Sequence, residues 1–419
     1  MTLIRSASPT KRPFTIHTSL LFDPKQKRFR KNISITVNPD NGLITKVFER
    51  ASSSIEDAST PASPDDIDLR NLTIIPGLSL TSRILRTTNH LRAALLAGYT
   101  TYRDLGTEGA FDADIGVRDS VNRGIIPGPR LYVATEAIAS SGGYEIRQEN
   151  RLGGTSVPRI SDPADGPVGV RAAVRRRIGA GADVVKFYAD YRKRVLRFPQ
   201  EAWPGAGCVH FAPEDKDGMD RNPNLPLFTK EEMIAMVEEA RENRAPIAAH
   251  SGVAECVIRA AEAGVTTIEH GNDPSEEAIW AMKEHGTIYV PTLRILELNG
   301  TKDVMLPYVK RAYDAGVKLA AGGDTGPVAH GGNVRELELM VEGGIPLEEA
   351  LVAATVRGWE ACGAEWCGRK FGWFEEGVAA DVVGLRGDPR QDIGSLREVE
   401  FVMKDAKVWK MDGDAMGMV

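Results

Sequence analysis

Four residues that could perform chemistry stand at or near the carboxyl ends of short apolar runs. His250 follows Pro-Ile-Ala-Ala, His270 ends the run TTIEH, Lys186 lies within ADVVKFYAD, and Asp324 follows Ala-Ala-Gly-Gly. In folds built on parallel strands, the carboxyl ends of the strands meet on one face, and catalytic groups gather there. We therefore expect these four side chains to lie together and to form a metal or acid–base site.

Each of the four residue types suits such a site, but each also has an ordinary structural explanation. Imidazole is the commonest protein ligand of transition metals. A lysine in an apolar run is costly to bury as a cation, so Lys186 must be paired, neutralised or chemically modified. Taken singly, the residues could be packed histidines, a paired lysine and a helix-capping aspartate. Their shared position at strand ends is what favours a site.

The elements that would position these residues alternate along the middle of the chain. Amphipathic stretches separate the candidate strands, and one stretch opens with a capping box at Thr229 and Glu232. Eight such units in about 290 residues predict a (β/α)8 TIM barrel, whereas no strand is followed by the GxGxxG of a Rossmann fold. The eight candidate strands are residues 72–78, 99–104, 130–134, 183–188, 246–250, 266–270, 287–291 and 317–322.

Both ends of the chain have the pattern of β structure. Short alternating runs flank a turn signal at residues 40–42, and similar runs near the carboxyl end flank a turn at residues 405–406. We expect these runs to assemble into one small β-sandwich domain. The predicted division is a composite β-sandwich of residues 1–75 and 371–419, and a barrel of residues 76–370 with a long loop insertion near 190–228.

Composition and charge argue against several functional classes. The net charge is −6, which gives no indication of a surface for nucleic acid or anionic membrane. The four cysteines form no CxxC pair, so we expect reduced thiols. The amino-terminal stretch lacks the pattern of a secretory signal, and no apolar run reaches transmembrane length. We expect a cytoplasmic protein that acts on a small molecule.

Several motifs occur together in a characteristic order. They are IIPGL at 74–78, YTTYRDLG at 99–106, GADVVKFYAD at 181–190, TTIEHG at 266–271, AAGGDTG at 320–326 and HGGNVRELELMVEGG at 330–344. With them the chain resembles the amidohydrolase superfamily over nearly its whole length. The resemblance is to the branch of imidazolonepropionase-like and Xaa-Pro dipeptidase-like enzymes, and most closely to its fungal ochratoxinase-like members. It implies a hydrolase of amide or cyclic-amide C–N bonds that forms homo-oligomers.

The resemblance also implies roles for the four strand-end residues. In the family, the lysine matching Lys186 is carboxylated and bridges two divalent metals, because a carbamate turns a costly buried cation into an anionic ligand. The histidines matching His250 and His270 bind the second metal. The aspartate matching Asp324 binds the first metal and acts as the catalytic base. The metals make water acidic enough to attack at neutral pH.

One family element is missing from this chain. The family's first metal is also held by a His-x-His pair directly after the PGL of strand one, but here residues 76–78 are followed by SLTSRILR. His90 lies further on in a helical pattern, so we interpret it as a helix residue and not as a replacement ligand. Lys186, His250 and His270 with a water would match a catalytic zinc site. We therefore expect one Zn²⁺ in place of two.

The missing His-x-His pair leaves other interpretations of the chain open. The chain could be a repurposed barrel that acts as a lyase, isomerase or decarboxylase, or an inactive binding partner. It could also be the product of a gene model that omits the exon coding for the motif. Retention of four ligand-type residues favours retained hydrolytic chemistry, whereas the missing pair argues for the alternatives.

Four more residues are candidates for binding substrate. Tyr188 stands two positions after Lys186 on the same strand face, and His330 follows Asp324 in the last loop. Tyr144 and Arg147 lie in the loop after the third strand and could bind an acidic group. Packing or loop bracing would equally explain them. The substrate classes that the resemblance suggests are N-acyl amino acids, dipeptides with proline and aryl amides of amino acids.

Overall fold

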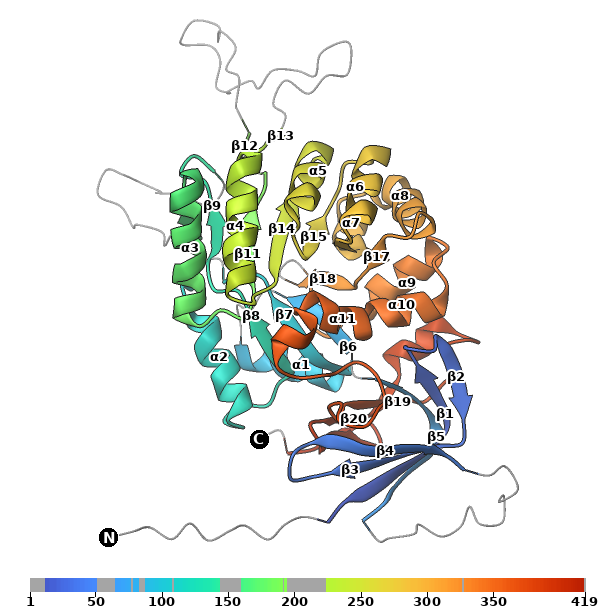
Figure 1. The fold of residues 1–419 in the computed structure, drawn as a ribbon. Coiled ribbons are helices and arrows are strands. Elements are labelled where there is room, and N and C mark those ends of the chain that lie inside the picture. Colours follow the sequence, from blue (N-terminus) through green and yellow to red (C-terminus); the bar gives the residue numbers. More distant parts are fainter. Residues whose placement is uncertain are drawn as a thin grey trace, which may run out of the picture.

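The chain forms a mixed α/β structure. The computed structural model describes residues 12–50, 65–76, 78–82, 87–107, 109–143, 160–190, 192–193, 224–325 and 328–417. Within them, helices alternate with parallel strands through the middle of the chain, and mainly antiparallel strands come from both ends (Figure 1). The predicted alternation of strands and helices is therefore confirmed.

The parallel strands of the middle region form two sheets. Their bounds are β6 (Leu78–Ser82), β7 (Tyr99–Asp104), β8 (Arg130–Val133), β9 (Ala137–Ala139), β10 (Ser161–Pro163), β11 (Val185–Tyr188), β14 (Ile247–Ser251), β15 (Thr267–His270), β16 (Ile288–Val290), β17 (Lys318–Leu319) and β18 (Gly322–Thr325). One sheet has the order β10-β9-β11-β14-β15-β16-β17, and the other has the order β18-β6-β7-β8. The chain passes from one sheet to the other between β8 and β9 and again between β17 and β18.

Most predicted strands match observed ones to within two residues, but the first and the last differ. Residues 72–76 belong to β5 (Ile67–Pro76), which lies in a different sheet, and the parallel strand β6 begins only at Leu78. The predicted last strand is divided into β17 and β18, because the amide of Ala321 between them donates to the carbonyl of Ala353 and not to a neighbouring strand.

Helices cover the outer side of the parallel strands (Figure 1). The predicted capping box is present at the start of α4, where Thr229 and Glu232 each bind the other's backbone amide. Helices α3 and α5 end at Gly181 and Gly264 in the left-handed conformation that glycine favours. The bounds are α1 (Thr87–Leu96), α2 (Ala113–Asn122), α3 (Gly166–Ala180), α4 (Lys230–Glu242), α5 (Ala254–Ala263), α6 (Glu276–Glu284), α7 (Leu293–Leu298), α8 (Lys302–Asp314), α9 (Val334–Glu342), α10 (Leu347–Ala353) and α11 (Val356–Ala361).

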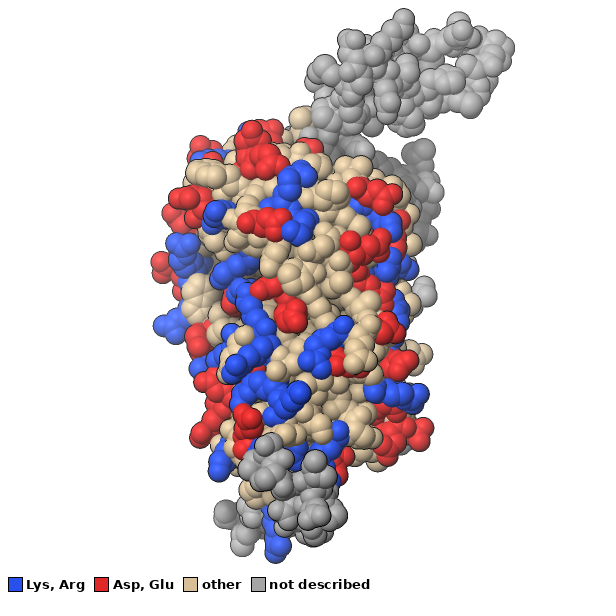
Figure 2. All heavy atoms as spheres, turned by 90° about the vertical axis from the view of Figure 1, so that its right-hand side faces the viewer, with Lys and Arg blue, Asp and Glu red and all other residues tan. Residues whose placement is uncertain are grey.

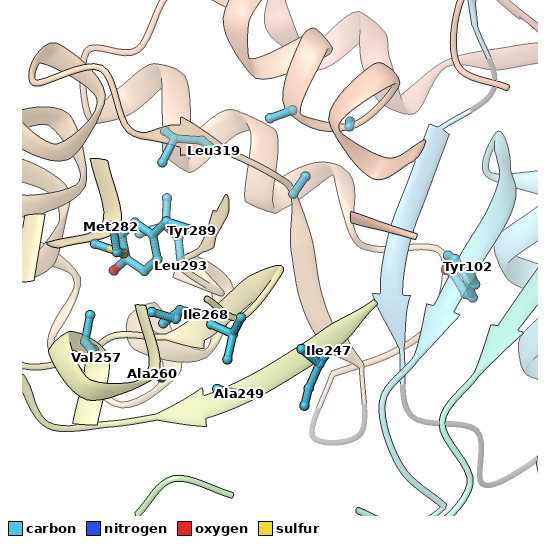
Figure 3. Packing of buried hydrophobic residues seen from close by; sticks show 14 of the residues in the cluster. Tyr102, Ile247, Ala249, Val257, Ala260, Ile268, Met282, Tyr289, Leu293 and Leu319 are labelled. Atoms are coloured by element: carbon cyan, nitrogen blue, oxygen red, sulfur yellow. The ribbon is translucent and has the colours of Figure 1, made fainter. Parts of the chain in front are cut away.

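The main apolar core lies between the parallel strands and these helices. Ile247 and Ala249 of β14 pack in it with Val257 of α5, and Figure 3 shows them with other members of the cluster. Ala248 belongs instead to a separate buried cluster with Leu105, Ala134 and Val184. Because side chains alternate along a strand, residues 248 and 250 point away from the helices, to the inner side of the sheet. By the same alternation, Lys186 shares that side with Val184.

A buried ion pair joins the inner sides of the two parallel sheets. Arg103 of β7 donates from Nη2 to Oε1 of Glu269 in β15 at 2.8 Å, and both side chains are 2% exposed. Nη1 of Arg103 donates to Oγ1 of Thr267 and to the carbonyl of Ala361, each at 3.0 Å. Since β7 and β15 belong to different sheets, these bonds link the two sheets directly.

Strands from the two ends of the chain share a nine-stranded sheet, seen below the helices in Figure 1. Strand β5 connects the halves, since it pairs with the amino-terminal β1 on one side and with the carboxyl-terminal β19 on the other. The turn predicted at residues 405–406 has positive φ at both positions, 50° and 64°, as a tight hairpin turn requires. Further bounds are β1 (Phe14–Asp23), β2 (Arg28–Lys31), β3 (Ile33–Asn38), β4 (Leu43–Glu49), β19 (Val382–Leu385), β20 (Val399–Lys404), β21 (Lys407–Met411) and β22 (Asp414–Ala415).

The ends of the predicted insertion are paired with each other. Strand β12 (Arg192–Lys193) runs antiparallel to β13 (Asn224–Leu225). Residue 191 and residues 194–223 lie outside the described part of the chain. Among the described helices, none is both long and apolar enough to cross a membrane. On the face drawn in Figure 2, basic and acidic side chains are interspersed, so no patch of one charge dominates that face.

The buried ion pair predicts a large stability effect. Arg103→Met would leave the Glu269 carboxylate buried beside an apolar side chain, and we expect it to lower the free energy of unfolding by about 3–5 kcal/mol in urea titrations. The matched control is Arg259→Met, which breaks the exposed pair between Arg259 and Glu255 and should cost about 0.5 kcal/mol or less. A loss below about 1 kcal/mol for Arg103→Met would contradict the structural role given to the pair.

Candidate active site

His250 and His270 meet at the carboxyl ends of the adjacent strands β14 and β15. Their ring centroids are 4.7 Å apart, and both side chains are buried. In the strand register His270 lies opposite Ser251, so regular alternation would point it away from His250. The backbone of His270 is left-handed instead, with φ at 77°. This break in the alternation allows the His270 ring to turn towards His250.

A side-chain oxygen holds one nitrogen of each ring. Oδ1 of Asp190 lies 3.0 Å from Nε2 of His250, and Oγ1 of Thr292 lies 2.9 Å from Nδ1 of His270. Our sequence interpretation missed both partners. Asp190 stands just after the end of β11, so the strand-end criterion that selected the other four residues could have selected it too. Thr292 follows the end of β16, where threonine is too common for its residue type alone to indicate a role.

Lys186 and Asp324 share the electrostatic environment of the two histidines. Lys186 is buried in β11, and Asp324 is partly exposed at the end of β18. Burial lowers the pKa of His270 to about 3, with His250 and Lys186 acting in the same direction and Asp324 and Glu269 opposing them. Lys186, His250 and Asp324 therefore all contribute to the electrostatic environment of the His270 ring. Their catalytic roles stay predictions.

Backbone strain collects at this end of the sheets. Non-glycine residues rarely adopt a left-handed backbone, and such strain concentrates at functional sites. Four residues at or just beyond the carboxyl ends of parallel strands adopt it: Thr135, His270, Thr292 and Asp324, with φ between 42° and 77°. Three of the four are candidate ligands or their direct partners.

The residues predicted to bind substrate do not share one environment in the described part of the chain. Tyr188 is buried at the end of β11, with its ring 5.8 Å from the His250 ring in an edge arrangement. The ring of His330 lies 4.6 Å from that of His90, which belongs to α1 as predicted, and 6.0 Å from that of Tyr102. His330 therefore packs against the side of α1. Tyr144 and Arg147 lie outside the described residues.

The described carboxylate, thiol and imidazole side chains do not by themselves form a metal site. In the described part of the chain, no three His, Cys, Asp or Glu side chains form a group that could hold a metal. Two imidazoles would therefore need Lys186 as a third ligand, and lysine becomes an anionic ligand only when carboxylated. Coordination would use Nδ1 of His250 and Nε2 of His270, opposite the nitrogens that Asp190 and Thr292 hold. Residues 78–86 contain no His, Cys, Asp or Glu that could complete a second site.

Comparison with known proteins identifies the family. Residues 209–411 match the Amidohydrolase family. Ochratoxinase from Aspergillus niger is 31% identical over 354 residues, which cover 76% of this chain and 67% of that protein. The chain belongs to the amidohydrolase family. As a member of this family, it is a hydrolase that acts on carbon–nitrogen bonds.

Solved amidohydrolase-like structures match nearly the whole chain. A crystal structure of a Xaa-Pro dipeptidase with bound methionine in the active site has a TM-score of 0.74 and 29% identity, and covers 95% of this chain and 100% of that one. The crystal structure of Aspergillus niger ochratoxinase has a TM-score of 0.76 and 25% identity, and covers 98% and 99%. The resemblance stated from the motifs is thus confirmed at the level of the family.

In this amidohydrolase, the buried carboxylate of Glu336 holds the backbone next to Thr292, the hydrogen-bond partner of His270. Both oxygens of Glu336 in α9 accept backbone amides at the start of α7, from Leu293 at 2.8 Å and from Arg294 at 2.9 Å. These two residues directly follow Thr292, so Glu336 fixes the backbone that carries the Thr292 hydroxyl. Burial raises the pKa of Glu336 to about 8, and the charge of Asp324 adds to this effect.

This raised pKa predicts how stability depends on pH. Folded Glu336 keeps a proton that the unfolded chain releases between pH 4.5 and about 8, so its contribution to stability is lost as pH rises through that window. Glu336→Gln lacks this titration. We expect its free energy of unfolding, relative to the wild type, to increase between pH 4.5 and 8.5 by an amount on the order of 3–5 kcal/mol.

Glu338→Gln on the same helix is the control for this titration. Hydrogen bonds from Arg397 and Arg335 lower the pKa of Glu338, so its ionised form stabilises the fold and the Gln variant should lose stability at pH 8.5. Urea titrations at the two pH values measure both effects. Parallel pH profiles for the wild type and Glu336→Gln would contradict the assignment.

Proposed function

We propose that this protein is a metal-dependent hydrolase of amide C–N bonds that works with a single divalent ion, Zn²⁺. The observation that carries the proposal is the paired arrangement of His250 and His270, whose rings lie 4.7 Å apart. Asp190 and Thr292 hold one nitrogen of each ring. Histidines oriented by such hydrogen bonds are typical of metal sites.

We also propose an arrangement for the two parallel sheets and the terminal strands. We propose that the two parallel sheets are arcs of one closed (β/α)8 barrel of residues 76–370, and that residues 1–75 and 371–419 form a β-sandwich domain. The ion pair between Arg103 and Glu269 supports closure, since it joins the inner faces of the two sheets. Strand order also supports it, because β8 leads into β9 and β17 leads into β18.

Lys186 completes the ligand set. Its side chain is buried on the same side of the sheet as the two imidazoles, where an ammonium ion is costly. Carboxylation would replace this cation with an anion and give two neutral histidines a charged third partner. The chain has no ligand-type side chain in β6 to bind a second ion. We therefore propose one ion per chain, with a carbamate on Lys186.

The chain's own residues account for the proton transfers. The bound ion supplies Lewis acidity, which polarises the scissile carbonyl and makes water more acidic. Asp324 accepts a proton from the attacking water as the new C–O bond forms, and delivers it to the nitrogen as the C–N bond breaks. The products are a carboxylic acid and an amine. The partial exposure of Asp324 gives it access to both water and substrate.

We propose a small amide as substrate: an N-acyl amino acid, a dipeptide with proline or an aryl amide of an amino acid. The support is the similarity to proteins named ochratoxinase and Xaa-Pro dipeptidase. Tyr188 lies beside His250 and is proposed to contact the substrate. His330, Tyr144 and Arg147 are proposed to contribute from loops.

We expect hydrolysis of these amides by the purified protein to require a metal ion. Chelator should abolish hydrolysis, and added Zn²⁺ or Co²⁺ should restore it. His250→Ala should lose activity together with bound metal. Asp324→Asn should keep the metal but lower kcat by about 10²–10⁴-fold, because it removes the base. His285→Ala, at an exposed position after α6, is the control and should match the wild type.

Two outcomes would contradict the proposal. One is amide hydrolysis that persists in chelator and in His250→Ala, which would place the chemistry elsewhere. The other is a folded protein that binds neither Zn²⁺ nor Co²⁺, which would favour a repurposed or inactive barrel.

A further inference from the structure

Asp190 is a fully buried carboxylate that the sequence interpretation did not select. It follows β11 by two residues and is 0% exposed. Its two oxygens reach two different parts of the neighbouring β14–α5 segment, namely the ring of His250 and the backbone that begins α5. We propose that Asp190 is a positioning residue that fixes the ring of His250 so that Nδ1 faces the active site. This inference rests on the proposed function.

The two carboxylate oxygens have separate tasks. Oδ2 accepts the backbone amides of Gly252 and Val253, the latter at 3.0 Å. Oδ1 lies 3.0 Å from Nε2 of His250. One side chain therefore holds both the candidate ligand and the turn that follows it. Rotation of the His250 ring would break its bond to Oδ1. The carboxylate cannot follow the ring, because the amides of Gly252 and Val253 hold Oδ2.

The contact also selects the tautomer of His250. When the carboxyl group of Asp190 is ionised it can only accept hydrogen bonds, so Nε2 then carries the proton in its bond to Oδ1. In the neutral ring, the lone pair is then on Nδ1. Thr292 cannot make such a choice for His270, because a hydroxyl both donates and accepts. The bond to Asp190 thus dictates which nitrogen of His250 can bind a metal.

Asp190→Asn separates this role from simple support of the fold. The amide oxygen can accept from Gly252 and Val253 as Oδ2 does, which turns the NH₂ group towards Nε2 of His250. That group donates, so it requires a bare Nε2 and moves the proton to Nδ1. The variant should thus keep the turn but reverse the tautomer. Loss of such an orienting partner typically costs 10–100-fold in metal affinity.

The test has two measurements. The first is the ¹⁵N chemical shifts of the His250 ring in metal-free protein, assigned by the signals that disappear in His250→Gln. We expect Nε2 protonated in the wild type and Nδ1 protonated in Asp190→Asn. The second is Zn²⁺ affinity by calorimetric titration, which should fall by about 10–100-fold in the variant.

Asp114→Asn is the matched control. Asp114 is also a buried aspartate, in the first turn of α2, and it accepts the backbone amides of Thr135 at 2.8 Å and Ile115 at 3.0 Å, each with a different oxygen. An amide in its place must turn a donor towards one of those amides, so this variant should lose stability. Its His250 tautomer and Zn²⁺ affinity should stay those of the wild type.

The outcomes distinguish the positioning role from the proposed function. A wild-type ring protonated on Nδ1 overturns the positioning role without any variant, and so does an Asp190→Asn ring that keeps the wild-type tautomer. A wild type that binds no Zn²⁺, combined with a tautomer that reverses in Asp190→Asn, supports the positioning role and refutes the metal-dependent function. Reversal together with weakened Zn²⁺ binding supports both.

Discussion

The ion pair between Arg103 and Glu269 is the contact on which the arrangement of the strands depends. Its two charges are almost fully buried, so each would be costly to leave without the other. Glu269 directly precedes His270, and it shares Arg103 with Thr267 on the same strand. The pair therefore sets the position of β15 against the opposite sheet. Because Glu269 directly precedes His270, the pair also fixes the backbone next to the His270 ring.

The absence of the His-x-His pair that the resemblance leads us to expect does not affect the pairing of the strands that carry Lys186, His250 and His270. The strands that carry Lys186, His250 and His270 are neighbours in one sheet, in the order β11, β14, β15, and their register is set by their own hydrogen bonds. Strand β6, where the missing pair would be expected, belongs to the other sheet. Loss of ligands there does not disturb the ladder that aligns the two histidines. The alignment of His250 with His270 therefore does not depend on residues in β6.

The sequence was sufficient to predict most of the parallel strands, because regularly spaced apolar runs indicate which segments are buried, but it did not predict β9 and β10. It was not sufficient for the first strand, since residues 72–78 are apolar enough for either sheet and only the pairing of β5 with β1 and β19 decides. Thr292 becomes significant only through its contact with His270 of the neighbouring strand, whereas Asp190 met the strand-end criterion and was overlooked. The left-handed backbone at His270 also lacks a sequence signal, because glycine is the residue expected there.

The central claim is that one metal ion lies between His250 and His270. Anomalous X-ray diffraction at the zinc edge, on crystals of the zinc-loaded protein, tests it most directly. We expect a single strong peak per chain, within bonding distance of Nδ1 of His250, Nε2 of His270 and an oxygen of a carboxylated Lys186. A second peak of equal strength beside β6, or a peak that contacts neither histidine, would contradict it.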